Sequence, residues 1–454
     1  MSTTATETPT APTLTPTSQL TLQDNVDIAT FDSSTQEKNF RLELPDGRHF
    51  QINERLYQLL EILRTPMTME EAAYAFHQGT GNQIPLDQLS ILCEQLVERG
   101  VIVIEGQPLQ PVKPVTPKAY LGMHFRRDLI SAKHLAPIAR LFQGFFRWRL
   151  AIPAIVLIVV THVFAYRELS LQSEITLELL TGPLLTAGVL FSMLLHELGH
   201  LAACHRWKCS HGPLGFGLYF SLPIFYVDVT QSWRLSRLQR AIVDVGGLYL
   251  QMLCVPLALL LYWWTGNTTY LTIILTIDML ILYNLEPFMK LDGYWLLSDL
   301  TGVPNLHART RDFAFQWGRR LLQRFSGKPS TTPVVSPFSQ WRWWVRTTIW
   351  GYLLLSVVIW PLFMLYWIPM LWQLLLGYPA LIQEALATLG TTTMQGDFLG
   401  VLSQLSAFFM PSLMLLGISL ELRRHGKRLY GALQQRWQRM ARKRASSQPV
   451  PTAV

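Results

Sequence analysis

The sequence predicts a mainly α-helical membrane protein with about six transmembrane helices and a small α+β, winged-helix-like domain at the N-terminus. Half of the 454 residues are hydrophobic. From about residue 147 onward the apolar residues gather in runs of about twenty, the length that crosses a hydrocarbon core of about 30 Å. The first 110 residues have instead the composition of a disordered tail followed by a soluble domain.

Residues 1–35 are rich in Thr, Pro and Ser and contain few apolar anchors, which predicts a disordered tail. Residues 36–106 are expected to form the winged-helix-like domain. The alternation of Phe40, Leu42 and Leu44, a Pro-Asp-Gly turn at 45–47, and a second alternation in 50–52 together predict a β-hairpin.

Three helices follow in this domain. Asn53 is the expected N-cap of the first, and Thr68 with Glu71 has the spacing of a capping box for the second. The third begins near Pro85 and ends at Gly100, before a short strand over 101–104. Residues 107–147 read as a Pro-containing linker and a basic amphipathic segment, which either lies on the membrane surface or is a solvated connecting helix. Its basic residues are Arg126, Arg127, Lys133, Arg140 and Arg147.

The predicted spans are 149–166, 180–204, 241–264, 270–289, 346–368 and 399–420. Residues 148–305 would form the catalytic membrane core, 306–345 a basic cytosolic loop, 346–421 the C-terminal transmembrane helices and 422–454 a basic cytosolic tail. Proline at 361 and 369 leaves two alternatives for 343–377: one tilted span with an interfacial piece, or a hairpin.

The net charge of +8 raises the question of nucleic-acid binding. Arg and Lys gather instead in the loops 205–240 and 290–346 and in the tail, next to the predicted spans. We therefore expect no nucleic-acid partner. The positive-inside rule places a multi-pass protein in the inner membrane, with both termini and the active site toward the cytosol. Four scattered cysteines make no disulfide framework.

The strongest chemical signal is the run His196-Glu197-Leu198-Gly199-His200. On a helix, the two histidines share a face and can bind one Zn²⁺, while Glu197 can take a proton from a zinc-bound water. The motif ends an apolar span, where ionisable side chains are costly unless they have a function. A helix-capping polar cluster is the structural alternative.

A catalytic zinc needs a third protein ligand. A histidine at the sixth position after His200 is excluded, because that residue is Arg206, and Glu286 is the only glutamate between 201 and 300. Asp292 is the better candidate, because it follows the fourth span at the membrane depth of the two histidines. Pro287 is expected to break the helix before it.

The pairing of His-Glu-Leu-Gly-His with Asn284-x-x-Pro-x-x-x-x-Asp292-Gly resembles the site-2 protease family of intramembrane metalloproteases. The segment 225–229, Trp233, Arg240 and Gly246-Gly247 are similar to a bacterial subgroup of peptide zinc metalloproteases. The resemblance covers roughly residues 120–305. It implies zinc ligands His196, His200 and Asp292, catalytic Glu197, and Asn284 as a residue that orients the substrate or the transition state.

Several assignments stay open. Asn284 has a helix–helix hydrogen bond as its alternative role, and Asp278 is expected to form a buried hydrogen bond rather than act in a proton relay. The family's small-residue motif usually contains Gly-Pro and a later Asn, whereas here Gln251 follows Gly246-Gly247. Residues 212–227 are too broken by Gly and Pro to span, and are predicted to form a re-entrant hairpin along which a substrate strand could pair. A second metal site at Cys204, His205, Cys209 and His211 is disfavoured by its spacing.

The N-terminal domain resembles the PqqD-like domains that capture leader peptides, with simple packing on the membrane domain as the alternative. The sequence therefore predicts a membrane-embedded zinc metalloprotease that cleaves a peptide or membrane-protein substrate. The rival hypothesis is a non-proteolytic membrane component of a peptide maturation or export system with a structural metal. A transporter would be expected to show internal repeats, and none is visible.

Overall fold

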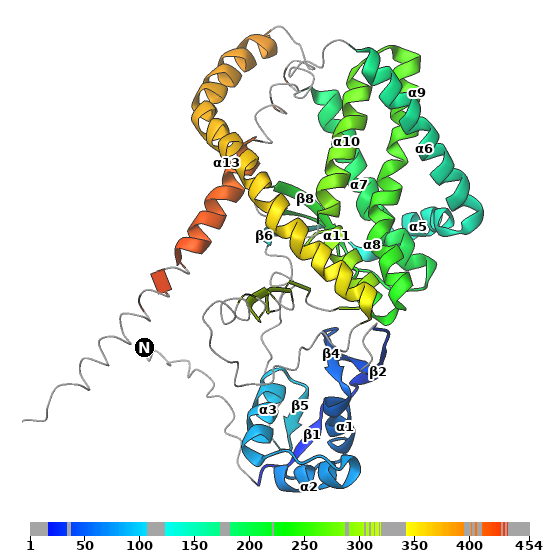
Figure 1. Ribbon diagram of the computed structural model, residues 1–454. Helices are drawn as coiled ribbons and strands as arrows, with labels where there is room; N and C mark the ends of the chain where they lie inside the picture. The colour runs from blue at the N-terminus through cyan, green and yellow to red at the C-terminus, as the bar shows by residue number, and fades with distance from the viewer. Residues whose placement is uncertain are drawn as a thin grey trace, which may run out of the picture. The chain divides into compact units, whose positions relative to one another are not determined.

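The protein is described by a computed structural model that covers residues 17–33, 38–106, 123–172, 182–219, 222–286, 290–303 and 342–394 (Figure 1). Scattered residues between 306 and 318 and between 401 and 434 are also described. The chain forms two compact units. One contains the N-terminal domain, Trp233–Arg237 and Ser298–Ile349. The other contains Pro117–Ser232, Leu238–Leu297 and Trp350–Val454.

The N-terminal domain contains the predicted hairpin, three helices and closing strand. Its elements are β1 (Leu20–Leu22), β2 (Asp27–Phe31), β3 (Asn39–Glu43), β4 (His49–Asn53), α1 (Glu54–Ile62), α2 (Met69–Thr80), α3 (Leu86–Glu98) and β5 (Ile102–Ile104). The helices and strands enclose one apolar core, in which Leu42, Leu59, Phe76 and Leu89 are fully buried.

Local signals explain why these helices begin where they do. Asn53 Oδ1 accepts a hydrogen bond from the Leu56 N–H at 2.9 Å, which satisfies an amide of the first turn of α1. Thr68 and Glu71 form the predicted capping box at α2. Gly47 has φ +82° in the hairpin turn, a conformation that favours glycine.

The predicted disordered tail over residues 1–35 is wrong for residues 20–31. β1 pairs antiparallel with β5, and β2 pairs antiparallel with β3. The prediction rested on the composition of residues 1–35, in which Thr, Pro and Ser of the first 17 residues dominate. Leu20 and Leu22 are nevertheless buried in the core, against partners far away in sequence. Residues 1–16 lie outside the described part.

The predicted hairpin is β3-β4, and the strand order is β2-β3-β4. Because β3 lies between two strands, β4 is the only strand of this hairpin at an edge of the sheet. In the same compact unit, Arg234 donates to Glu43 at 2.9 Å, and the Trp233 ring lies 5.7 Å from that of Phe31. Burial acts to raise the pKa of Glu43, but the contacts with Arg234, His49 and Arg41 lower it below its ordinary value. Part of the sheet surface is therefore occupied by another segment of the chain.

The second unit contains the long apolar helices, which run alongside one another in Figure 1. They are α6 (Trp148–Leu171), α7 (Pro183–Arg206), α8 (Arg237–Met252), α9 (Cys254–Thr265) and α10 (Thr269–Leu285). Among the described residues, three helical stretches are long and apolar enough to cross a membrane: α6, α7 and the consecutive α8 and α9. α10 is apolar but shorter. These helices support membrane association, while the total of six spans stays a prediction.

A polar cluster joins α6 to α10 within this unit. Asp278 Oδ1 lies 3.1 Å from His162 Nε2, and Asp278 Oδ2 accepts a hydrogen bond from the Tyr166 hydroxyl at 2.8 Å. Each carboxylate oxygen of Asp278 thus has a partner on the neighbouring helix. The contact with His162 is part-buried and that with Tyr166 is exposed, so the hydrogen bonding expected of Asp278 is present but is not fully buried.

Helix α13 (Trp343–Met394) runs as one helix of 52 residues, with Pro361 and Pro369 inside it. The hairpin alternative for 343–377 is therefore wrong, because neither proline ends the helix. The span predicted over 399–420 lies only partly within the described residues, and the basic loop at 319–341 lies outside them.

A three-stranded antiparallel sheet accompanies the helices: β6 (Met123–Ile130), β7 (Leu214–Tyr219) and β8 (Leu222–Val227), in that order. β7 and β8 form the predicted hairpin. β6 corrects the prediction of one amphipathic segment, since Arg126 and Arg127 lie on a strand, whereas α5 (Ala132–Phe142) and the 3-10 helix Gln143–Phe146 that follows it are helical. The Arg126 guanidinium lies over the ring of Tyr226 on β8, 4.4 Å from its centroid.

Candidate metal centre

The two histidines of the motif lie near the end of α7. His196 and His200 are four residues apart, so both rings project from one face of the helix. Their Nε2 atoms are 3.1 Å apart, and both residues are buried. The helix therefore presents two nitrogens to one point.

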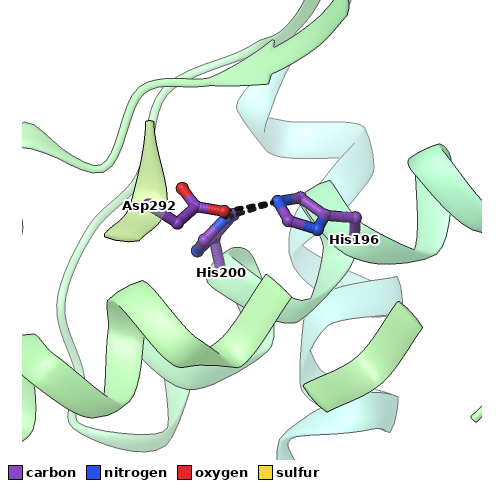
Figure 2. A group of neighbouring side chains, drawn as sticks. All are labelled: His196, His200 and Asp292. Atoms are coloured by element: carbon purple, nitrogen blue, oxygen red, sulfur yellow. Dashed lines mark hydrogen bonds and ion pairs between the residues drawn. The ribbon is translucent and has the colours of Figure 1, made fainter. Parts of the chain in front are cut away.

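Asp292 brings a carboxylate to the same point from the first residue of α11 (Asp292–Thr301). Its Oδ2 lies 2.8 Å from His196 Nε2 and 3.5 Å from His200 Nε2. Figure 2 shows this oxygen directed at both rings. In the described part of the chain, His196, His200 and Asp292 form the one group of at least three such side chains that could hold a metal ion.

The chain before Asp292 is held by close backbone contacts. α10 ends at Leu285, and a Cβ placed on Gly293 would lie 2.1 Å from the Leu285 carbonyl oxygen. The backbone N–H of Lys290 donates to the Tyr219 hydroxyl of β7 at 3.2 Å. Gly293 is thus needed to bring the start of α11 against the end of α10. Pro287 itself lies outside the described residues.

Helix α8 closes the other side of the group. A Cβ on Gly247 would lie 2.4 Å from His200 Nε2 and 2.7 Å from His196 Nε2. A Cβ on Gly199 would lie 2.1 Å from the Gly246 carbonyl oxygen. Real Cβ atoms do not approach so closely, so these glycines are what allow α8 to lie against the metal-facing edge of α7.

Hydrogen bonds on the far side of each ring indicate which nitrogens are free. His200 Nδ1 lies 2.8 Å from the Val243 carbonyl oxygen, and His196 Nδ1 lies 2.9 Å from Gln251 Oε1. An oxygen of this kind only accepts, so each Nδ1 carries the proton. In the neutral rings, both Nε2 lone pairs then point toward Asp292.

This arrangement fits a cation. Asp292 Oδ2 is buried and accepts no hydrogen bond from any described residue. Two imidazole nitrogens with one carboxylate oxygen are a ligand set typical of catalytic Zn²⁺, which leaves a fourth position for water or substrate.

Glu197 follows His196 on α7 and is half-buried. Its carboxyl lies beside the backbone N–H of Val227, the last residue of β8, and close enough to Asp292 and both histidines to interact with their charges. The predicted base is therefore next to the metal group without belonging to it.

Asn284 is half-buried in the last turn of α10, and no described residue forms a hydrogen bond with its side chain. The helix–helix hydrogen bond expected as its alternative is absent from this part of the structure. Glu286, the only glutamate considered as an alternative third ligand, is the C-cap residue of α10 and does not belong to the metal group.

The disfavoured second metal site gains no support, since the described residues at Cys204, His205, Cys209 and His211 form no such group. Cys204 and Cys209 are buried and are not joined in a disulfide. Sequence reasoning did not identify Ser192 and Val243, and it noted Gln251 without its contact with His196. The spacing of these residues was a usable signal. Residues 192, 196 and 200 are four apart and share one face of α7, and residues 243, 247 and 251 likewise share one face of α8.

Comparison with known proteins gives one similarity to a curated protein. The chain is 30% identical over 110 residues to the Bacillus subtilis (strain 168) protein named "Putative peptide zinc metalloprotease protein YydH". The matched segment is 24% of this chain and 44% of that protein, so the chain spans less than half the length of this relative. No family model and no solved structure matches the chain.

The similarity and the His196–His200–Asp292 group together support a peptide-related zinc metalloprotease.

Loss of any ligand should release the metal. The purified protein should hold about one zinc per chain, and His196→Ala, His200→Ala or Asp292→Ala should each lower zinc affinity by more than about tenfold, because even supporting residues cost that much. Elemental analysis after dialysis against a chelator measures this. Asp278→Asn is the matched control, since Asp278 is an aspartate among the same helices outside the group. Full zinc retention in Asp292→Ala would remove Asp292 as a ligand and point to Glu286.

Proposed function

We propose that the chain is a membrane-embedded zinc metalloendopeptidase of the site-2 protease type, which hydrolyses a peptide bond in a peptide or membrane-associated substrate. The observation that carries this proposal is the convergence of His196 Nε2, His200 Nε2 and Asp292 Oδ2 beside Glu197. A structural zinc would be expected to have a closed set of four protein ligands, whereas this group supplies three.

The residues have distinct roles in this proposal. His196, His200 and Asp292 hold Zn²⁺, which when bound supplies Lewis acidity and makes water a stronger acid. Glu197 accepts a proton from the attacking water and returns it to the leaving nitrogen, as a general base and then a general acid. Asn284, whose amide has no partner among the described residues, is available to donate to the oxygen that becomes negative.

The sheet next to Glu197 offers a way to hold the substrate. β8 is an outer strand of the β6-β7-β8 sheet, and no strand in the described part pairs with its second edge. Its last residue, Val227, lies beside Glu197. We propose that a substrate segment pairs with this edge in extended form, which would expose its backbone to the site.

Glu197→Gln separates the protease from its rival, a scaffold with a structural metal. The substitution keeps the size of the side chain but removes the base, so cleavage should fall by at least about 10²-fold while zinc remains bound. The measurement pairs zinc content with cleavage of the native substrate in reconstituted membranes. A peptide maturation system that works unchanged with Glu197→Gln would favour the scaffold.

We also propose that the protein is a multi-pass inner-membrane protein with both termini and the metal centre toward the cytosol, from the distribution of Arg and Lys. Single cysteines at Ser236 and Lys328 should react only with membrane-permeant reagents in intact cells. Cysteines at Asn267 and Thr392 should also react with impermeant reagents. Labelling of Lys328→Cys from outside would overturn this orientation.

The N-terminal domain is proposed to deliver the peptide by adding it to β4, the open edge of its sheet, with α3 as the apolar wall. The fragment to test is 17–106, because β1 and β2 belong to the core. It should bind peptides encoded beside the gene with a Kd in the micromolar range, about −8 kcal/mol. In an NMR titration, shifts should map to β4 and α3. Shifts elsewhere, or no binding, would leave the domain a structural role.

A further inference from the structure

Gln251 connects His196 to a chain of buried hydrogen bonds between α7 and α8. We propose that Gln251 is a positioning residue that fixes the ring orientation and the tautomer of His196, so that its Nε2 lone pair is available to the metal. This inference rests on the proposed metal centre. It does not depend on whether the bound metal cleaves peptides.

The donor and acceptor in each of these hydrogen bonds follow from the first bond of the series, between Ser192 and Val189. The Val189 carbonyl can only accept, so Ser192 Oγ, 2.8 Å away, donates to it. Ser192 has one hydroxyl proton, so its oxygen is left to accept from Gln251 Nε2 at 3.3 Å. The amide of Gln251 then presents Oε1 to His196 Nδ1 at 2.9 Å. His196 must donate from Nδ1.

The opposite amide orientation shows what this arrangement prevents. Gln251 would then present N–H to His196 Nδ1 and place the ring proton on Nε2. That N–H would point at Asp292 Oδ2, 2.8 Å away, and would block the metal. Ser192 disfavours this state, because its proton would have to leave the Val189 carbonyl to serve Gln251 Oε1. Both Ser192 and Gln251 are fully buried, so water does not compete for these bonds.

The two histidines are oriented by different means. His200 donates to the Val243 backbone carbonyl, which no side-chain substitution removes. His196 depends on a side chain, so its preparation for the metal is sensitive to residue 251. Groups behind a metal ligand commonly set its orientation and basicity in this way.

The test compares zinc affinities of the full-length protein by chelator competition. Gln251→Leu should weaken zinc binding about 10- to 100-fold, since it removes the acceptor of the His196 Nδ1 proton. Gln251→Glu keeps an acceptor oxygen at that place and should restore most of the loss. Tyr249→Phe is the matched control: it lies on the same helix and loses a hydrogen bond to the Phe145 carbonyl, away from the metal group. It should bind zinc as the unsubstituted protein does.

Ser192→Ala supplies the second measurement. It should weaken zinc binding less than Gln251→Leu, and it should have no further effect in the double variant, because Ser192 acts only through Gln251. In the cobalt-substituted protein, Gln251→Leu should shift the visible absorption bands that report ligand geometry. A residue that served packing alone would leave that spectrum unchanged.

The outcomes are distinguishable. Zinc bound equally well by the unsubstituted protein and Gln251→Leu would overturn the positioning role and leave the metal centre intact. Equal losses in Gln251→Leu and Gln251→Glu, with lowered thermal stability of the metal-free forms, would make Gln251 a packing residue. No zinc binding by the unsubstituted protein would overturn the metal centre and this inference together.

Discussion

The close packing of α7 against α8 is the constraint on which the rest of the site depends. Gly199 on α7 meets Gly246 on α8 with no room for a Cβ on either side. Gly247 brings the α8 backbone against the Nε2 atoms of both histidines. Without this approach, the Val243 carbonyl and the Gln251 amide could not reach the Nδ1 atoms, and the rings would lack a defined orientation. Small residues at helix contacts in membranes commonly have this role, because they let backbones approach.

The packing of α7 against α8 also explains why the His196–His200–Asp292 group is suited to bind a cation. Gln251 and Val243 of α8 accept hydrogen bonds from the two Nδ1 atoms. In the neutral rings, the two Nε2 lone pairs and the anionic Oδ2 of Asp292 then meet at one buried point. An anionic oxygen and two lone pairs at such short separation repel one another where water is excluded. A divalent ion converts the repulsion into three ligand bonds, so folding and metal binding are expected to be coupled. The contact between α7 and α8, which orients both rings, is thus expected to set the metal affinity.

Sequence reasoning succeeded where the signal was local. The His196/Glu197/His200 spacing, the position of Asp292 after an apolar helix, and the caps at Asn53 and Thr68 each depend on residues a few positions apart. It failed where partners are distant. β1 is a strand because it pairs with β5 at the far end of the N-terminal domain, and β6 is a strand because it pairs with β7 much later in the chain. Gln251 was noticed only as a departure from a family motif, since nothing in one helix shows which histidine on another it contacts.

Two aspartates among the apolar helices show how a functional site differs from a structural one. Asp278 has a partner for each carboxylate oxygen, from His162 and Tyr166, so the cluster is complete and holds α6 to α10. Asp292 is enclosed to a similar degree, with 19% of its side chain exposed against 13% for Asp278, yet its Oδ2 faces two ring nitrogens whose protons lie on the other side. Both arrangements place a charge where water is scarce, a cost that proteins retain only for a reason. The carboxylate of Asp278, whose two oxygens both have partners, stabilises the contact between two helices. The carboxylate of Asp292, whose Oδ2 has none among the described residues, is instead suited to bind a metal ion.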